Sequence, residues 1–297
     1  MLEVRQLHPL FMGEVSGVDL GRPVDPDTLA ALVAALDRHA VLVFHDQFID
    51  DEQQLAFSRL LGPLETTRQA HRPAVKLRLH VGVSDVSNLD ENNRLLQGED
   101  YRRMSGLANR LWHTDSSFKR TPAKYSLLSA RILPSWGGET EFADLRAAYD
   151  ALPQRKQAAI EHLVAEHSIY TSRAKIGFTD FTEAERAALP PVPQVLVRRH
   201  PGSGRKGLYL ASHADAIQGM PLPEARMLLL DLIEHATQRQ FVYQHRWRLG
   251  DLVIWDNRCT MHRQREFDLA EVRDMHRTTV ADTAPTLEQE GRTATAA

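Results

Sequence analysis

The sequence contains very little cysteine. Its 297 residues include a single one, Cys259, so no disulfide can form within the chain. A chain without disulfides is typical of a reducing compartment, and the opening residues MLEVRQLHPL lack the apolar stretch of a secretory signal. We therefore expect a cytoplasmic protein, in which Cys259 is a small buried hydrophobic residue.

Long apolar runs and an excess of one charge are also missing. No apolar run approaches the ~18 residues of a membrane-spanning helix, and the net charge is only -3. Nucleic-acid binding needs a basic surface, so we expect neither a nucleic-acid nor a membrane partner. With 42% hydrophobic residues the chain can form a substantial core. We expect one domain over residues 1–282, a disordered tail over 283–297, and a homo-oligomer.

The spacing of apolar residues predicts a mainly β protein with flanking helices. A helix is expected to follow the N-cap Asp25, a buried strand at 41–44, and an amphipathic helix at 223–236. Further strands are predicted at 125–133, 139–142, 241–247, 251–255 and 274–280, the third and fourth of them paired through Gly250. Long irregular segments at 64–108 and 172–193 are typical of lids over a binding site.

Two segments far apart in the sequence carry residues that can bind a metal ion. His113 and Asp115 are two positions apart, so on an extended strand both side chains point to one face. His262 follows an apolar segment and a turn, and it would supply the third ligand. Two histidines and one carboxylate form the facial triad of non-haem Fe(II) oxygenases. The HxD pair alone is weak evidence in a chain with 14 histidines and 39 acidic residues.

Two arginines follow the second segment. Arg273 and Arg277 are four residues apart and would share one face of a strand. Arginine stays charged at any working pH and binds a carboxylate through its planar guanidinium group. Paired arginines beside a metal therefore indicate that the ligands are small carboxylic acids.

Four longer motifs resemble the Fe(II)/2-oxoglutarate-dependent dioxygenases of the taurine dioxygenase and 2,4-dichlorophenoxyacetate dioxygenase superfamily. They are LWHTDSSF at 111–118, GGETEFADLRAAYDALP at 137–153, HPGSGRKGLYL at 200–210 and GDLVIWDNRCTMHR at 250–263. The resemblance covers about residues 5–282 and is stronger to the 2,4-dichlorophenoxyacetate branch. It implies a distorted double-stranded β-helix, the jelly roll shared with cupins. It also implies Fe(II) as cofactor, with 2-oxoglutarate and O2 as cosubstrates.

The resemblance also implies roles for individual residues besides the three metal ligands. Thr140 and Arg273 match the positions that bind 2-oxoglutarate, and Arg277 matches the position that holds the carboxylate of the substrate. His213, beside a glycine-rich hairpin, and His71, in the first irregular segment, are further candidates for contact with the substrate.

The reaction implied is hydroxylation of the methylene next to the ether oxygen of an aryloxyalkanoate such as 2,4-dichlorophenoxyacetate. The resulting hemiacetal would collapse to a phenol and glyoxylate, while 2-oxoglutarate yields succinate and CO2. One alternative is a dioxygenase for taurine, other alkylsulfonates or another small carboxylate, because Arg277 could bind any of these anions. Others are a metal-binding, cupin-like regulatory protein and a zinc hydrolase. The regulatory protein would lack a ligand or Arg273, and the hydrolase would have no use for the two arginines or Thr140.

Overall fold

The computed structural model describes residues 2–67 and 76–292. Its largest unit is a seven-stranded sheet in the order β1-β2-β3-β13-β5-β15-β4. All neighbours in this sheet are antiparallel except β2 and β3. The strands are β1 (Glu3–Gln6), β2 (Gly13–Ser16), β3 (Val41–Phe44), β4 (Ser84–Asp85), β5 (Ala123–Ile132), β13 (Leu252–Asp256) and β15 (Asp274–Ala281).

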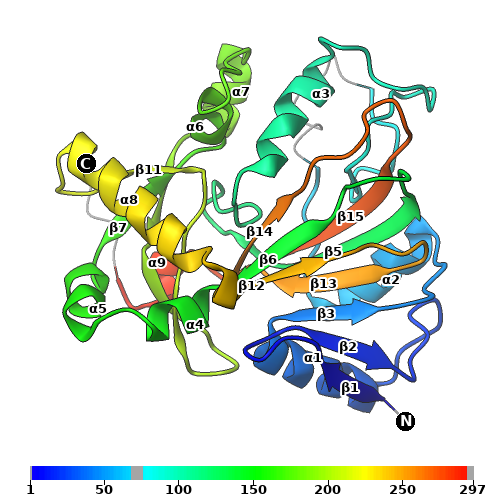
Figure 1. Cartoon of the computed structure of the whole chain (residues 1–297), viewed down its shortest axis with the longest axis horizontal. Helices are drawn as coiled ribbons and strands as arrows, with labels where there is room; N and C mark the ends of the chain where they lie inside the picture. Colours follow the sequence, from blue (N-terminus) through cyan, green and yellow to red (C-terminus); the bar gives the residue numbers. More distant parts are fainter. Residues whose placement is uncertain (1, 68–75, 293–297) are drawn as a thin grey trace.

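Three smaller sheets complete the β structure. A three-stranded sheet has the order β12-β6-β14, a second has β11-β7-β8, and β10 pairs with β9. Their strands are β6 (Thr140–Asp144), β7 (Val164–His167), β8 (Val192–Val195), β9 (Val197–Arg199), β10 (Lys206–Leu208), β11 (Ala214–Ile217), β12 (Val242–His245) and β14 (Thr260–Gln264). Phe142 of β6 packs in one buried cluster with Leu128 and Trp255 of the large sheet. The β12-β6-β14 sheet therefore packs against the large sheet (Figure 1).

Two helices cover the outer face of the large sheet. Helix α1 (Pro26–His39) begins at Asp25, whose carboxylate accepts from Thr28 N, and α2 (Asp51–Leu61) begins with a capping box. Leu36 of α1 and Phe57 of α2 join the cluster formed by the large sheet. These local signals are readable in the sequence, and both predicted elements, the helix after Asp25 and the strand at 41–44, are confirmed.

A third helical group packs around the smaller sheets. It consists of α4 (Leu145–Asp150), α5 (Gln154–Ile160) and α8 (Leu222–Ala236), which share a buried cluster with β7 and β9. The predicted helix at 223–236 is confirmed by α8. Within the described residues, no helix is long and apolar enough to cross a membrane.

The two irregular segments form short helices that lie at the same end of the molecule (Figure 1). The first segment contains α3 (Tyr101–Gly106), followed by η2 (Leu107–Arg110). Helix α6 (Ile169–Ala174) leads into the second segment, which contains α7 (Glu183–Ala188). Tyr101 makes edge-to-face contacts with Phe178 and Phe181, so the two segments pack against each other.

Two sequence expectations about the strands are wrong. The segments at 241–247 and 251–255 do not pair, because β12 joins β6 while β13 lies between β3 and β5. Both edges of β13 are thus occupied, and the turn at Gly250 carries the chain from one sheet to the other. His113 and Asp115 are also not on a regular strand. His113 forms an isolated bridge, and the chain turns at Ser116, which has a φ of 52°.

The expected tail over 283–297 is wrong for its first part. Helix α9 (Thr286–Gln289) forms there, after β15, and its residues Thr286 and Leu287 are buried. The other short helix, η3 (Arg239–Phe241), lies earlier in the chain, between α8 and β12. Gln289 accepts a hydrogen bond from Arg198. Local composition was misleading because one apolar residue, Leu287, is enough to pack a single helical turn onto an existing surface.

Candidate active site

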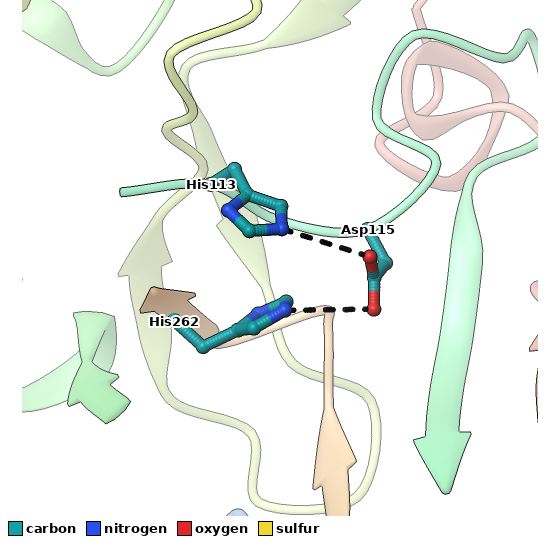
Figure 2. A group of neighbouring side chains, drawn as sticks. All are labelled: His113, Asp115 and His262. Carbon is teal, nitrogen blue, oxygen red and sulfur yellow. Dashed lines mark ion pairs between the residues drawn. The ribbon is translucent and has the colours of Figure 1, made fainter. Parts of the chain in front are cut away.

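The three predicted metal ligands converge (Figure 2). His113 and His262 are bridge partners whose backbone groups exchange two hydrogen bonds of 3.0 and 2.8 Å, which brings their ring centroids to 4.2 Å. Asp115 places Oδ1 3.9 Å from His113 Nε2 and Oδ2 3.7 Å from His262 Nε2. Bonds of roughly 2.0 to 2.2 Å, as for zinc, allow two donors to lie up to roughly 4.4 Å apart around one ion. Both carboxylate distances fall within this limit.

The protonation of the cluster suits a cation. Burial lowers the pKa of both imidazoles, so they are neutral at pH 7. Burial alone would raise the pKa of Asp115, but the charge of Arg277, together with the hydrogen bond from Ser126, opposes it, and this pKa is lowered to about 2. His113 Nδ1 lies 2.8 Å from the carbonyl oxygen of Leu111, which can only accept. Nδ1 therefore carries the hydrogen, and Nε2 presents its lone pair toward the centre.

Two polar residues that sequence reasoning missed hold Asp115 in place. Ser126 Oγ donates to Asp115 Oδ2 at 2.8 Å, and Asn257 Nδ2 donates to Ser126 Oγ at 2.9 Å. Asn257 Oδ1 also accepts from the backbone N–H of Asp115 at 3.1 Å. Asn257 stands in the motif before His262, but nothing in the sequence links Ser126 to this site. Such supporting hydrogen bonds orient a ligating carboxylate.

Arg277 reaches the same carboxylate. Its Nη1 lies 2.5 Å from Asp115 Oδ1, while its Nε has no hydrogen-bond partner among the described residues. The side chain lines two cavities, a smaller and a larger one, that meet at the His-Asp-His cluster. Arg277 therefore lies beside the predicted metal ligands, as the sequence led us to expect. Its guanidinium keeps N–H donors that a bound anion could use.

The smaller cavity contains an unpaired buried cation. It is lined by Arg273 together with Thr140, His113 and His262. Arg273 is buried, and burial lowers the pKa of its guanidinium to about 10. No acidic side chain of the described residues forms an ion pair with it, and its Nε lacks a hydrogen-bond partner there. A buried charge without a counter-ion is unfavourable, so this cavity fits an anionic ligand.

The glycine and threonine of the GGET motif shape this cavity. Gly138 has a φ of +78°, and a Cβ at this position would stand 3.2 Å from Arg273 Nε, so a side chain here would be both strained and crowded. Thr140 Oγ1 accepts a hydrogen bond of 3.0 Å from Trp247 Nε1. The hydroxyl hydrogen of Thr140 is therefore available to a ligand in the cavity. The sequence contains no sign that Trp247 takes part.

The larger cavity also borders the cluster. His113, Asp115 and Arg277 line it together with His213, Phe118 and residues of both irregular segments, among them Tyr101 and Arg173. The structure therefore brings His213 to the same cavity as His113 and Asp115, two of the predicted metal ligands. His71 lies outside the described residues. Closure of the two segments over a substrate stays a prediction.

A second convergent group is not a metal site. His200, Asp256 and Cys259 are buried and close together. However, Asp256 already accepts from His200 at 2.9 Å and from Arg258 at 2.6 Å. Burial raises the pKa of Cys259, which keeps it a thiol. A buried arginine on the carboxylate excludes a second cation, and the interpretation of Cys259 as a small buried residue is confirmed.

The observed donors fit both Fe(II) and 2-oxoglutarate. Neutral imidazoles and an ionised carboxylate are the nitrogen and oxygen donors of the facial triad. The counter-ion that Arg273 lacks is what a dicarboxylate would supply. A zinc hydrolase would leave this buried arginine without a purpose.

Comparisons with known proteins agree with this chemistry. Residues 3–279 match the family described as taurine catabolism dioxygenase TauD, TfdA family. The alpha-ketoglutarate-dependent 2,4-dichlorophenoxyacetate dioxygenase of Cupriavidus pinatubonensis is 45% identical over 94% of this chain and 97% of its own. The (S)-phenoxypropionate/alpha-ketoglutarate-dioxygenase of Sphingobium herbicidovorans is 38% identical over 94% of each. The crystal structure of AAD-2 with Mn(II) and N-oxalylglycine has a TM-score of 0.89 and 50% identity, covering 96% of this chain and 98% of that one.

Proposed function

The chain belongs to the TauD, TfdA family of dioxygenases, and from this premise we propose that it oxidises aryloxyalkanoates such as 2,4-dichlorophenoxyacetate. It is an Fe(II)- and 2-oxoglutarate-dependent enzyme that consumes O2. One oxygen atom enters the C–H bond next to the ether oxygen, and the other enters succinate as 2-oxoglutarate loses CO2. From 2,4-dichlorophenoxyacetate, the hydroxylated product is a hemiacetal, which breaks its C–O bond to give a phenol and glyoxylate.

His113, Asp115 and His262 would hold the iron. When bound, Fe(II) supplies the centre at which O2 is activated and 2-oxoglutarate is oxidatively decarboxylated. The chain contributes neutral imidazoles, and Ser126 orients the carboxylate of Asp115 by its hydrogen bond. Fixed ligands need little rearrangement when the ion binds.

Arg273 and Thr140 would hold 2-oxoglutarate in the smaller cavity. The guanidinium of Arg273 would pair with the carboxylate farther from the metal, because it is the cavity's buried cation without a described counter-ion. Thr140 would donate its hydroxyl hydrogen to the ligand, while its oxygen accepts the hydrogen bond from Trp247. This unpaired charge beside the His-Asp-His cluster is the observation that carries the proposal.

The substrate would occupy the larger cavity. Arg277 would pair with its carboxylate through donors that Asp115 does not use, which places the adjoining methylene beside the metal ligands. Phe118 and Ile169 offer apolar surface to an aryl group, and His213 lines the same cavity. The names of the aryloxyalkanoate dioxygenases among the relatives support this substrate class over taurine.

We further propose that the fold is of the jelly-roll type. The β12-β6-β14 sheet faces the large sheet across the site, which supports a distorted double-stranded β-helix of the jelly-roll type. We also propose a single catalytic domain over residues 1–282, a homo-oligomer and a cytoplasmic location.

A substrate panel tests the function. Succinate release from the Fe(II) enzyme with 2-oxoglutarate and O2 should depend on an aryloxyalkanoate and be accompanied by an equal amount of phenol. Taurine, an alkylsulfonate and a cinnamate-like acid serve as competing substrates. Release with taurine but with no aryloxyalkanoate would contradict the proposal.

An anaerobic titration tests the site separately. Fe(II) and 2-oxoglutarate together should produce a visible metal-to-ligand charge-transfer band, and Asp115→Ala should remove it. The matched control Asp256→Asn alters the other buried cluster and should keep the band if the protein folds, which far-ultraviolet circular dichroism would establish. A band of unchanged intensity in Asp115→Ala would contradict the ligand assignment.

A further inference from the structure

Three buried side chains form a hydrogen-bonded chain behind the wall of the larger cavity. Ser117 Oγ lies 2.9 Å from His213 Nδ1 and 3.0 Å from His167 Nδ1. All three residues are buried, but only His213 lines the cavity. The ring of His213 is also held edge-on against Phe118, with centroids 5.0 Å apart. His213 Nδ1 is therefore committed to the interior.

The backbone around the two histidines is firmly held. His167 ends β7 and pairs with Ala214 of β11, the residue after His213. The ammonium group of Lys175 donates to the carbonyl oxygens of Ser212 and Ala214, on either side of His213. The backbone on either side of the two rings is therefore fixed by strand pairing and by the hydrogen bonds of Lys175.

The serine permits only two arrangements of hydrogens. Burial and the charge of Lys175 lower the pKa of His167 to about 3, so this ring is neutral and carries one N–H. Ser117 Oγ lies within hydrogen-bond distance of Nδ1 of both rings. A hydroxyl has one hydrogen, so Ser117 donates to one Nδ1 and accepts from the other.

The surroundings of His167 Nε2 favour one of these two hydrogen arrangements. If Ser117 donated its hydrogen to His167 Nδ1, the hydrogen of the His167 ring would be on Nε2. If Ser117 donates to His213 instead, His167 carries its hydrogen on Nδ1, and His167 Nε2 has a lone pair. His167 Nε2 is buried without a partner among the described residues. Buried N–H groups are left unpaired less often than buried acceptors, and the charge of Lys175 also favours a lone pair nearby. Ser117 therefore donates to His213.

We propose that Ser117 and His167 are positioning residues that hold His213 in its Nε2–H tautomer, so that His213 donates a hydrogen bond to an oxygen of the bound substrate. The inference rests on the proposed function insofar as the substrate occupies the larger cavity. No hydrogen bond to His213 Nε2 occurs within the described part of the chain, so this nitrogen is available. The other tautomer would present a lone pair, which repels an ether or carboxylate oxygen.

Kinetics test whether Ser117 acts through His213. Ser117→Ala should raise the KM for the aryloxyalkanoate about threefold to tenfold, with little change in the KM for 2-oxoglutarate. Ser117→Thr keeps the hydroxyl and should restore the lower KM. His213→Gln places an amide N–H near the position of Nε2 without needing Ser117.

A double variant separates this role from a general structural one. In the His213→Gln background, Ser117→Ala should have almost no further effect on the KM for the aryloxyalkanoate, because the two residues would act as one unit. His213→Leu, which has no donor, should raise this KM more than His213→Gln. Additive effects of Ser117→Ala and His213→Gln would overturn the proposal.

Nitrogen-15 NMR of the Zn(II)-loaded protein reports the tautomer directly. His213 should show a protonated Nε2 and His167 a protonated Nδ1, with the signals assigned from His213→Gln and His167→Gln. A protonated Nδ1 on His213 would overturn the inference. The spectrum needs no substrate, so its result is distinct from a failure of the succinate-release panel, which would instead contradict the proposed function.

Discussion

Replacing Arg273 by methionine should affect the ligand-free and the ligand-bound protein in opposite directions. Burial lowers the pKa of this arginine from 12.5 to about 10, which corresponds to about 3 kcal/mol of unfavourable free energy for keeping the charge in the fold. Methionine removes that term but also the hydrogen bonds to the carbonyl oxygens of Val86 and Gly138, worth about 1 to 2 kcal/mol together. The ligand-free protein should gain about 1 to 2 kcal/mol, a rise in Tm of roughly 2 to 6 °C.

The response to 2-oxoglutarate should be largely lost in the same variant. Removing a buried partner of a bound carboxylate costs roughly 2 to 5 kcal/mol, or about 30-fold or more in Kd. At a 2-oxoglutarate concentration 100 times the wild-type Kd, the wild-type protein is stabilised by about 2.7 kcal/mol and the variant by less than about 1 kcal/mol.

Thermal unfolding with anaerobic Fe(II), with and without 2-oxoglutarate, measures both effects. Arg131→Met is the matched control, because burial also lowers the pKa of Arg131, which lies 3.4 Å from Asp51 and lines neither cavity. This control should keep the full shift with 2-oxoglutarate. The assignment of Arg273 would be refuted if Arg273→Met were less stable than wild type without ligand and yet kept the wild-type shift.

Three further outcomes are expected. Arg277→Ala should raise the KM for the aryloxyalkanoate about 30-fold or more while changing that for 2-oxoglutarate little; equal effects on both, measured by succinate release, would contradict its role. Burial lowers the pKa of His276, but the carboxylates of Asp274 and Asp51 outweigh burial and raise it above its usual value. The charged imidazole therefore stabilises the fold fully below about pH 6.5, and this stabilisation is lost as the pH rises through the higher pKa of the folded state. His276→Gln should therefore lower Tm at pH 6 but not at pH 9, and the reverse order in unfolding scans would exclude this linkage. Cys259 should react with a thiol reagent only when the protein unfolds, because it is buried and burial raises its pKa; rapid labelling of the native protein would show otherwise.

Elements with local signals were predictable. The helix after Asp25, the strand at 41–44 and α8 follow from capping residues and apolar spacing within a few residues of each element. Tertiary contacts overrode the same reasoning at the end of the chain. Composition predicted a tail from 283, but the burial of Leu287 and the hydrogen bond from Arg198 to Gln289 order α9.

The candidate site also combines residues that the local sequence predicts with residues that only tertiary contacts reveal. The ligand motif and the arginine at 273 stand in short segments whose residue types indicate their chemistry. The supporting residues Ser126 and Trp247 could not be found in this way, because serine and tryptophan carry no sign of the distant partner whose orientation they set. The ion pair between Arg277 and Asp115 joins residues 162 positions apart.

The sequence by itself indicated which side chains can bind iron and an organic acid, because coordination and charge depend on residue type and on short-range order. Only the tertiary structure decided how they work together. His113 pairs with His262 through an isolated bridge and not on a regular strand, and Ser117 joins the side chains of His167 and His213, which no local pattern connects. The physical reason is that backbone pairing and burial join distant segments, and they, not the local sequence, set the distances, protonation states and hydrogen-bond directions of the site.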